Sequence, residues 1–252
     1  MSETAVVRNL PVDAPLGPSV DGPSQDRGPL PGDPNQIDSF EFLAPDDPRR
    51  MMADRQLRPS GVFAMDVLAA FDAVPRERFI APELACVAYA DAPLRCVSGQ
   101  RMLLAPLILG RMLQSAEPRA HERALDVAGG SGYSACVLGR IVREVVALES
   151  EGSAARFDLG DNVTRAVGPV AEGAKDGGPF DVIIVNGVVA VAPAALMDQL
   201  AEGGRLIVME KQGPAIQIVR YDRIGGDLNR RSMFNGSGPA LPEFAAPERF
   251  IF

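Results

Sequence analysis

Residues 125–135 read LDVAGGSGYSA, and this stretch decides the fold class. The apolar run that leads into it, RALDV, is typical of a buried strand, and the residues after the last glycine suit a helix. Glycines between the two let a ligand approach the backbone, because no Cβ atoms stand in the way. A helix that begins near Gly132 also presents unpaired N–H groups and a partial positive charge. The stretch therefore predicts a strand–turn–helix that binds a nucleotide-like ligand.

Strands and helices alternate on the C-terminal side of this turn. Apolar runs predict further strands at 144–150, 162–168, 181–187 and 204–211, with helices at 132–143 and 193–200. The run at 181–187 is apolar on both faces, as a central parallel strand is. Residues 215–234 instead predict a hairpin with Gly225 and Gly226 at its turn. We therefore expect an α/β fold with a doubly wound, mostly parallel sheet and antiparallel C-terminal strands.

The N-terminal side of the turn is helical in pattern. Apolar residues at helical spacing predict helices within 47–57, 60–74, 81–90 and 105–116. These helices would form an N-terminal helical subdomain beside the sheet. We therefore expect three parts: a tail over 1–48, helices and a loop over 49–120, and the α/β domain with its hairpin over 121–252.

The tail carries most of the net charge of the chain. Residues 1–48 hold nine acidic and two basic side chains, a net charge of −7 out of −8, together with nine prolines. The tail has too few apolar side chains to offset the entropy lost when the chain becomes ordered, so we predict that it is disordered. The other 204 residues are nearly neutral. This composition predicts neither a basic face for nucleic acid nor a membrane span.

The cysteines and the N-terminus favour a cytoplasmic protein. Three cysteines are present, an odd number without close metal-binding spacing, so we expect free thiols and no metal site. A secretory signal would need a basic region followed by an apolar run, and the N-terminus has none.

Glu149 narrows the class of ligand. It stands at the carboxyl end of the strand that follows the glycine turn, and ligands of open α/β sheets bind at such ends. A carboxylate there accepts hydrogen bonds from both ribose hydroxyls of a nucleoside. NAD and S-adenosylmethionine satisfy this pattern equally. The turn lacks the third glycine at the NAD spacing, and its order of acid, glycines and helix is similar to the first motif of S-adenosylmethionine-dependent methyltransferases.

Five segments together resemble one family of these enzymes, the protein-L-isoaspartate O-methyltransferases. They are VPRERFIAPELACVAYADAPL at 74–94, QRMLLAPLILGRML at 100–113, LDVAGGSGYSACVLGR at 125–140, PFDVIIVNGVVAVAPAALMDQLAEGGRLIV at 179–208 and AIQIVRYDR at 215–223. The resemblance covers about residues 50–225. Within the family, the sequence is similar to the divergent branch found in alphaproteobacteria. It implies a Rossmann-like methyltransferase fold with S-adenosylmethionine as cofactor.

The resemblance also implies a reaction and a set of residues. The family methylates the carboxylate exposed when an aspartyl or asparaginyl peptide isomerises, a step of protein repair, so the expected partner is a protein or peptide carrying a carboxylate. We expect residues 49–120 to form the acceptor side, with Leu104 at the position of the family serine, and Asn186 to line the active site. The expected cofactor contacts are Asp126, Ala128, Gly129, Gly130, Ser131, Gly132, Tyr133, Glu149, Ser150, Pro169 and Gln217.

Four departures from the family pattern leave two alternatives open. Leu104 replaces a serine, Pro169 replaces an aspartate that contacts adenine, and Ala128 replaces a glycine. Only twelve residues separate Glu149 from Asn162, so the helix between them would be shortened or replaced by a loop. The alternatives are a methyltransferase with a different acceptor and a binding or scaffold protein that has lost catalysis.

Overall fold

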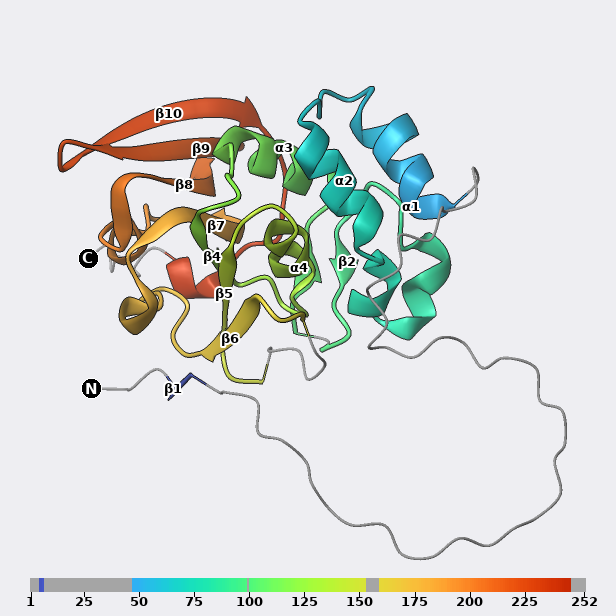
Figure 1. Ribbon diagram of the computed structural model, residues 1–252, viewed down its shortest axis with the longest axis horizontal. Helices are drawn as coiled ribbons and strands as arrows, with labels where there is room; N and C mark the ends of the chain where they lie inside the picture. The colour runs from blue at the N-terminus through green and yellow to red at the C-terminus, as the bar shows by residue number, and fades with distance from the viewer. Residues whose placement is uncertain (1–4, 7–46, 99, 153–158, 246–252) are drawn as a thin grey trace, which may run out of the picture.

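The fold is a mixed sheet of eight strands with helices on both faces (Figure 1). In this computed structural model the described residues are 5–6, 47–98, 100–152 and 159–245. The sheet order is β1-β6-β5-β4-β7-β8-β9-β10. The parallel strands are β4 (Arg123–Val127), β5 (Glu144–Glu149), β6 (Val163–Val167), β7 (Phe180–Val189) and β8 (Leu200–Gln212). The expected α/β class is confirmed.

Antiparallel strands close both edges of the sheet. On one side β9 (Ala215–Ile224) and β10 (Asp227–Asn235) form the predicted hairpin, in which Gly225 and Gly226 have φ values of 63° and 84°. Two residues with positive φ match the twist of a tight hairpin, which explains the glycine pair. On the other side β1 (Ala5–Val6) pairs with β6. These two residues belong to the predicted tail; residues 1–4 and 7–46 of that tail lie outside the described residues.

Helices pack on both faces of the sheet and divide the core into two clusters. On one face lie α1 (Pro48–Met51), which continues as a π-helix over Met52–Leu57, then α2 (Met65–Ala73), α3 (Pro106–Ala116) and α4 (Tyr133–Gly139) (Figure 1). On the other face lies the short α5 (Ala194–Met197). Between α2 and α3 the chain forms two 3₁₀ turns, Arg76–Phe79 and Pro82–Val87, and the small pair β2 (Leu94–Arg95) and β3 (Met102–Leu103).

Three predicted helices are shorter than their apolar patterns suggested. The segment 81–90 forms only the 3₁₀ turn over Pro82–Val87, and the helix predicted over 132–143 ends at Gly139. Asn162 Nδ2 donates to the Gly139 carbonyl at 2.8 Å, so a side chain from the loop before β6 satisfies this helix end. The helix predicted over 193–200 ends at Met197, because Leu200 already pairs with Phe180 in the sheet.

The sheet order reverses at β4, where β5 leads to one side and β7 to the other. Ligands of doubly wound sheets bind at the carboxyl ends of the strands beside such a reversal. Within the described ranges, no helix has the length and apolar character needed to cross a membrane.

Candidate active site

The glycine turn joins β4 to α4 at this reversal. Gly130 and Gly132 have φ values of 64° and 91°, the left-handed region that glycine adopts without strain. Ala128 also has a positive φ, 58°, and its side chain is buried. The substitution of alanine for glycine is therefore strained rather than harmless, at a cost of about 1–2 kcal/mol.

Close packing explains why the remaining positions are glycine. A Cβ on Gly129 would lie 2.3 Å from Asp126 Oδ2 and 2.6 Å from Ser134 Oγ. A Cβ on Gly130 would lie 2.5 Å from Cys96 Sγ and 2.8 Å from Arg101 Cβ. All four distances are far below van der Waals contact, so the turn accepts no side chain at either position without a shift of its neighbours.

Asp126 is a buried carboxylate held by two hydrogen bonds. Asn186 Nδ2 donates to its Oδ1 at 2.8 Å, and the Ser134 hydroxyl donates to its Oδ2 at 2.8 Å. Burial raises the pKa of Asp126 to about 6, although these two hydrogen bonds lower it. Asn186 Nδ2 also donates to the Val127 carbonyl at 3.0 Å and thereby ties the end of β7 to the end of β4.

Glu149 ends β5 with both carboxylate oxygens engaged. Its Oε2 accepts the Gly130 N–H at 2.8 Å, and its Oε1 accepts the Ser150 N–H at 2.8 Å. The Arg101 side chain donates to Oε1 from Nε at 3.0 Å and from Nη2 at 2.8 Å. Arg101 in turn pairs with Glu243. Burial would lower the pKa of Arg101, but Glu243 and Glu149 raise it above its ordinary value.

A small cavity lies between the carboxyl ends of β4 and β5. Its volume is about 10 Å³, roughly the room of one water molecule. The lining residues are Asp126, Gly129, Gly130, Gly132, Ala147, Leu148, Glu149, Leu159 and Arg165. The predicted acid, glycines and strand-end carboxylate are thus brought together in one place.

A second small cavity lies on the side of β7 and α3. Its lining is Met102, Leu103, Leu104, Leu109, Gly129, Tyr133, Ser134 and Asn186. Leu104 is buried, and its carbonyl accepts a hydrogen bond from Arg76 Nη2 at 2.8 Å. Arg76 is itself fully buried, and burial lowers its pKa. The two predicted acceptor-side residues, Leu104 and Asn186, therefore share one mostly apolar cavity.

Six of the eleven predicted cofactor residues do not line the first cavity: Ala128, Ser131, Tyr133, Ser150, Pro169 and Gln217. The Ser131 hydroxyl donates to the Phe79 carbonyl, and the Tyr133 ring packs against Phe79 and the Arg76 guanidinium. Pro169 follows β6, next to Gly168, whose N–H donates to the Glu149 carbonyl. Gln217 lies on β9 and accepts from the Ser232 hydroxyl. The segment expected to replace a helix after Glu149 falls largely at 153–158, outside the described residues.

The family is decided by comparison with known proteins. Residues 50–234 match the family described as protein-L-isoaspartate(D-aspartate) O-methyltransferase (PCMT). The chain belongs to this family. The match confirms the resemblance seen in the sequence motifs, and it covers the N-terminal helices, the glycine turn and the C-terminal hairpin.

Curated relatives agree with membership of the PCMT family, and a solved structure agrees with the fold. A protein-L-isoaspartate O-methyltransferase of Koribacter versatilis is 38% identical over 167 residues, which are 64% of this chain and 75% of the relative. One of Pelotomaculum thermopropionicum is 36% identical over 187 residues, 71% and 81% of the two chains. The structure of a putative family member from Plasmodium falciparum in complex with S-adenosyl-L-homocysteine has a TM-score of 0.66 at 21% identity, covering 79% of this chain and 100% of that one.

Three residues of this PCMT-family site were not predicted. Ser134 lies one residue beyond the quoted tyrosine, and its distance of eight positions from Asp126 follows from the strand–turn–helix geometry, so the sequence could have indicated it. Arg101 and Glu243 were missed for a physical reason. They lie 48 positions before and 94 positions after Glu149, and only the folded chain brings the three together.

Proposed function

We propose that the protein is an S-adenosylmethionine-dependent carboxyl O-methyltransferase that acts on isoaspartyl residues of proteins or peptides. The observation that carries this proposal is the cluster of Gly130, Asp126 and Glu149 at the sheet reversal of a PCMT-family chain. Residue types at this cluster fit the cofactor: glycines where a Cβ has no room, and a carboxylate at the end of β5.

Two carboxylates would hold different portions of the cofactor. Glu149 would accept the ribose hydroxyls, and the carboxylate of Asp126 would face the cationic amino acid portion, where a positive charge favours its ionised form. Gly129, Gly130 and Gly132 supply backbone without Cβ atoms at the cavity where the ligand would lie. When bound, S-adenosylmethionine supplies a methyl group that is already activated on a sulfonium.

The acceptor needs little activation by this chain. A carboxylate is ionised at neutral pH and is itself the nucleophile, so no general base is required. The side chains of Leu103 and Leu104 would exclude water from the transfer. Asn186, whose two amide N–H groups are donated to Asp126 and to the Val127 carbonyl, would line the pocket beside the carboxylate. The reaction turns the carboxylate into a methyl ester.

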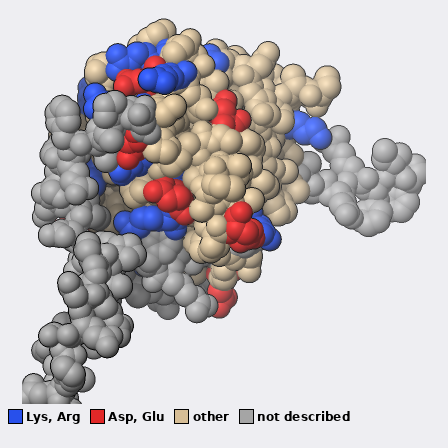
Figure 2. All heavy atoms as spheres, turned by 90° about the vertical axis from the view of Figure 1, so that its right-hand side faces the viewer, with Lys and Arg blue, Asp and Glu red and all other residues tan. Residues whose placement is uncertain are grey.

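A protein or peptide partner is also supported by the surface. Acidic and basic side chains are interspersed with uncharged ones on the face formed by the N-terminal helices (Figure 2). Nucleic acid recognition would call for a surface of one sign. We further propose a cytoplasmic location, which is supported by three free thiols, Cys86, Cys96 and Cys136.

The test is methyl transfer from labelled S-adenosylmethionine to an isoaspartyl peptide. The control peptide has the same sequence with an ordinary aspartyl linkage, and the control protein is heat-inactivated. We expect label in the isoaspartyl peptide, as a base-labile ester, and little in the control peptide. Equal labelling of both peptides would point to a different acceptor, and no labelling at saturating cofactor would exclude the proposed function.

A further inference from the structure

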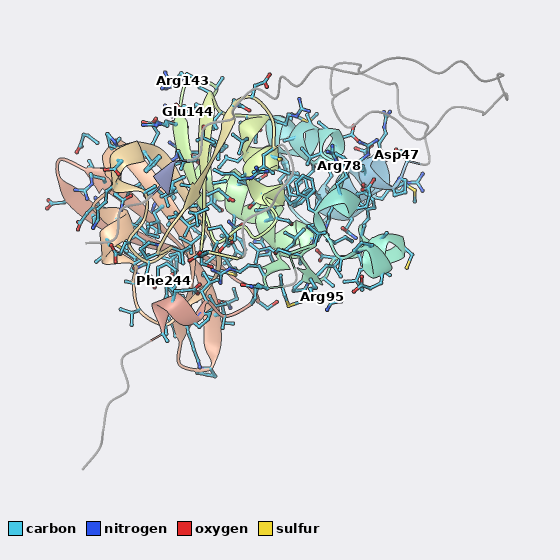
Figure 3. The ribbon with its side chains drawn as sticks, turned by 90° about the horizontal axis from the view of Figure 1, so that it is seen from below. Asp47, Arg78, Arg95, Arg143, Glu144 and Phe244 are labelled. Atoms are coloured by element: carbon cyan, nitrogen blue, oxygen red, sulfur yellow. The ribbon has the colours of Figure 1, made fainter. Side chains whose placement is uncertain are left out.

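Residues 236–245, here called the C-terminal cover, lie across the end of β7. The Val188 N–H donates to the Pro239 carbonyl at 2.8 Å, the Leu241 N–H to the Val188 carbonyl at 2.9 Å, and the Ala190 N–H to the Phe244 carbonyl at 3.1 Å. Figure 3 shows Phe244 far from Glu144, which begins β5 at the other end of the sheet. The cover therefore lies at the end of the sheet that carries the candidate active site.

The cover packs closely on the acceptor side of that site. A Cβ on Gly187 would lie 2.5 Å from Leu241 Cγ, so the cover rests directly on the backbone after Asn186. A Cβ on Gly238 would lie 2.8 Å from Met209 Sδ and 3.4 Å from Leu104 Cδ2. The cover thus occupies the space through which an acceptor peptide would reach Leu104 and Asn186.

Arg101 connects the cover to the cofactor side. Its guanidinium meets the carboxylate of Glu243 with Nη2 at 2.6 Å from Oε1 and Nη1 at 3.2 Å from Oε2, a two-pronged pair. The same guanidinium donates to Glu149 Oε1 from Nε and Nη2. One side chain therefore spans the cover and the carboxylate that would accept the ribose.

Arg101 also stands where the cofactor would lie. Its Cβ lies 2.8 Å, and its Cγ 3.4 Å, from the point where a Cβ on Gly130 would be. The cavity beside Gly130 and Glu149 has room for about one water molecule. Because Arg101 occupies Glu149 Oε1, a ribose hydroxyl reaches this oxygen only if Arg101 leaves it.

We propose that Arg101 and the C-terminal cover form a latch that closes the cofactor side and the acceptor side together. Binding of the cofactor ribose to Glu149 displaces Arg101, which releases Glu243 and opens the cover. This inference rests on the proposed function, because it takes Glu149 as the ribose acceptor. The Glu243 side chain is 29% exposed, so solvent screens its pair with Arg101. The pair of Arg101 with Glu149 is buried, so cofactor binding must offset the cost of breaking it.

The latch makes cofactor affinity depend on Arg101 and Glu243, which would not contact the bound cofactor. If only a small fraction of the molecules is open, the apparent dissociation constant of the cofactor equals the intrinsic constant divided by that fraction. Substituting Arg101→Met keeps the apolar stem and removes the guanidinium, and Glu243→Gln weakens the outer half of the latch at a half-buried position. Glu144→Gln is the matched control, because Glu144 pairs with Arg123 at 3.2 Å at the opposite end of the sheet.

The experiment measures S-adenosylhomocysteine affinity by calorimetry and amide exchange at Val188, Ala190 and Leu241 in the full chain. We expect the dissociation constant to fall about tenfold in Arg101→Met and less in Glu243→Gln, with Glu144→Gln unchanged. Both variants, and the wild type with ligand, should exchange faster at the three amides.

Two outcomes would overturn the latch, and they can be told apart. Equal affinity in all four proteins, with unchanged exchange, would leave the proposed function standing and exclude the latch. No binding to any of them, Arg101→Met included, would exclude both the cofactor site and the latch. Binding to Arg101→Met without binding to the wild type would be the strongest form of support.

Discussion

Ala128 shows how the turn tolerates a residue that its backbone disfavours. The residue follows β4 with a φ of 58°, and its N–H donates to the Leu148 carbonyl of β5 at 3.0 Å. The glycines that follow it leave the space beside Asp126 and Arg101 free of Cβ atoms. The strain at Ala128 therefore lowers the stability of the fold and leaves the glycine surface beside Asp126 unchanged.

We predict that Ala128→Gly destabilises the fold by less than Ala135→Gly does. Both remove a buried methyl group and add backbone entropy to the unfolded chain, but only the first relieves a left-handed alanine, because Ala135 lies in α4. The difference in the free energy of unfolding, measured by urea titration, should be at least about 1 kcal/mol. Equal losses in the two variants would contradict the positive φ at Ala128.

Because of Asp126, the free energy of unfolding should fall as pH rises. Its pKa is raised from 3.8 to about 6, so between these values the folded protein holds a proton that the unfolded chain has released. The free energy of unfolding should therefore fall as pH rises from 4 to 6, by up to about 3 kcal/mol relative to Asp126→Asn. Urea titrations of both proteins from pH 4 to 7 test this, and a flat difference would count against it.

At the residue scale, prediction from sequence succeeded where neighbours in sequence are neighbours in space. Gly130, Gly132 and Glu149 follow from the strand–turn–helix and from the end of the next strand. Arg101 and Glu243 do not, because no local pattern connects a loop before α3 with the segment after β10. The burial of Leu104 beside Gly238 depends on the same long-range contact.

At the element scale, the central strands were the most predictable part. Runs such as DVIIV are too apolar on both faces for anything but a covered strand, and β4 to β8 formed where expected. The helix predicted over 81–90 is shorter than expected, because only Pro82–Val87 form a helix, of the 3₁₀ type, before the chain runs on to β2. Short helices depend on packing more than on pattern, and the pattern alone overestimates them.

Arg205 fixes the relation of three elements at the far end of the sheet. It lies on β8, pairs with Glu122 just before β4 at 2.6 Å from Nη1 and 2.8 Å from Nη2, and donates to the carbonyl of Ala116 at the end of α3. Both side chains are 6% exposed. This bidentate pair therefore holds α3 against the sheet, far from the candidate site.

We predict that Glu122→Gln lowers the free energy of unfolding by about 3–5 kcal/mol, because it leaves the Arg205 charge buried without its counterion. Glu144→Gln breaks a comparable pair with Arg123, but in partly exposed surroundings, and should cost about 1 kcal/mol or less. Chemical denaturation of the two variants compares them directly. Similar losses in both would show that burial of the Arg205 pair has no special weight.

At the scale of the whole molecule, the site is built by three parts that are distant in sequence. The sheet supplies Asp126 and Glu149, the helical part supplies Arg101 and Leu104, and the C-terminal cover supplies Glu243. The predicted division into a helical part and an α/β domain does not indicate that the C-terminal cover lies over the site. The proposed methyl transfer therefore requires cofactor binding at the end of β5.

The most direct test is the affinity for S-adenosylhomocysteine, measured by calorimetry on the wild type, Glu149→Ala and Glu144→Ala. The two variants remove the same side chain from the two ends of β5. Two charge-assisted hydrogen bonds to a ribose are worth several kcal/mol, so Glu149→Ala should weaken binding by more than about tenfold. Glu144→Ala should bind like the wild type. Equal affinity in Glu149→Ala and the wild type, or no binding by the wild type and Arg101→Met, would contradict the proposed cofactor site.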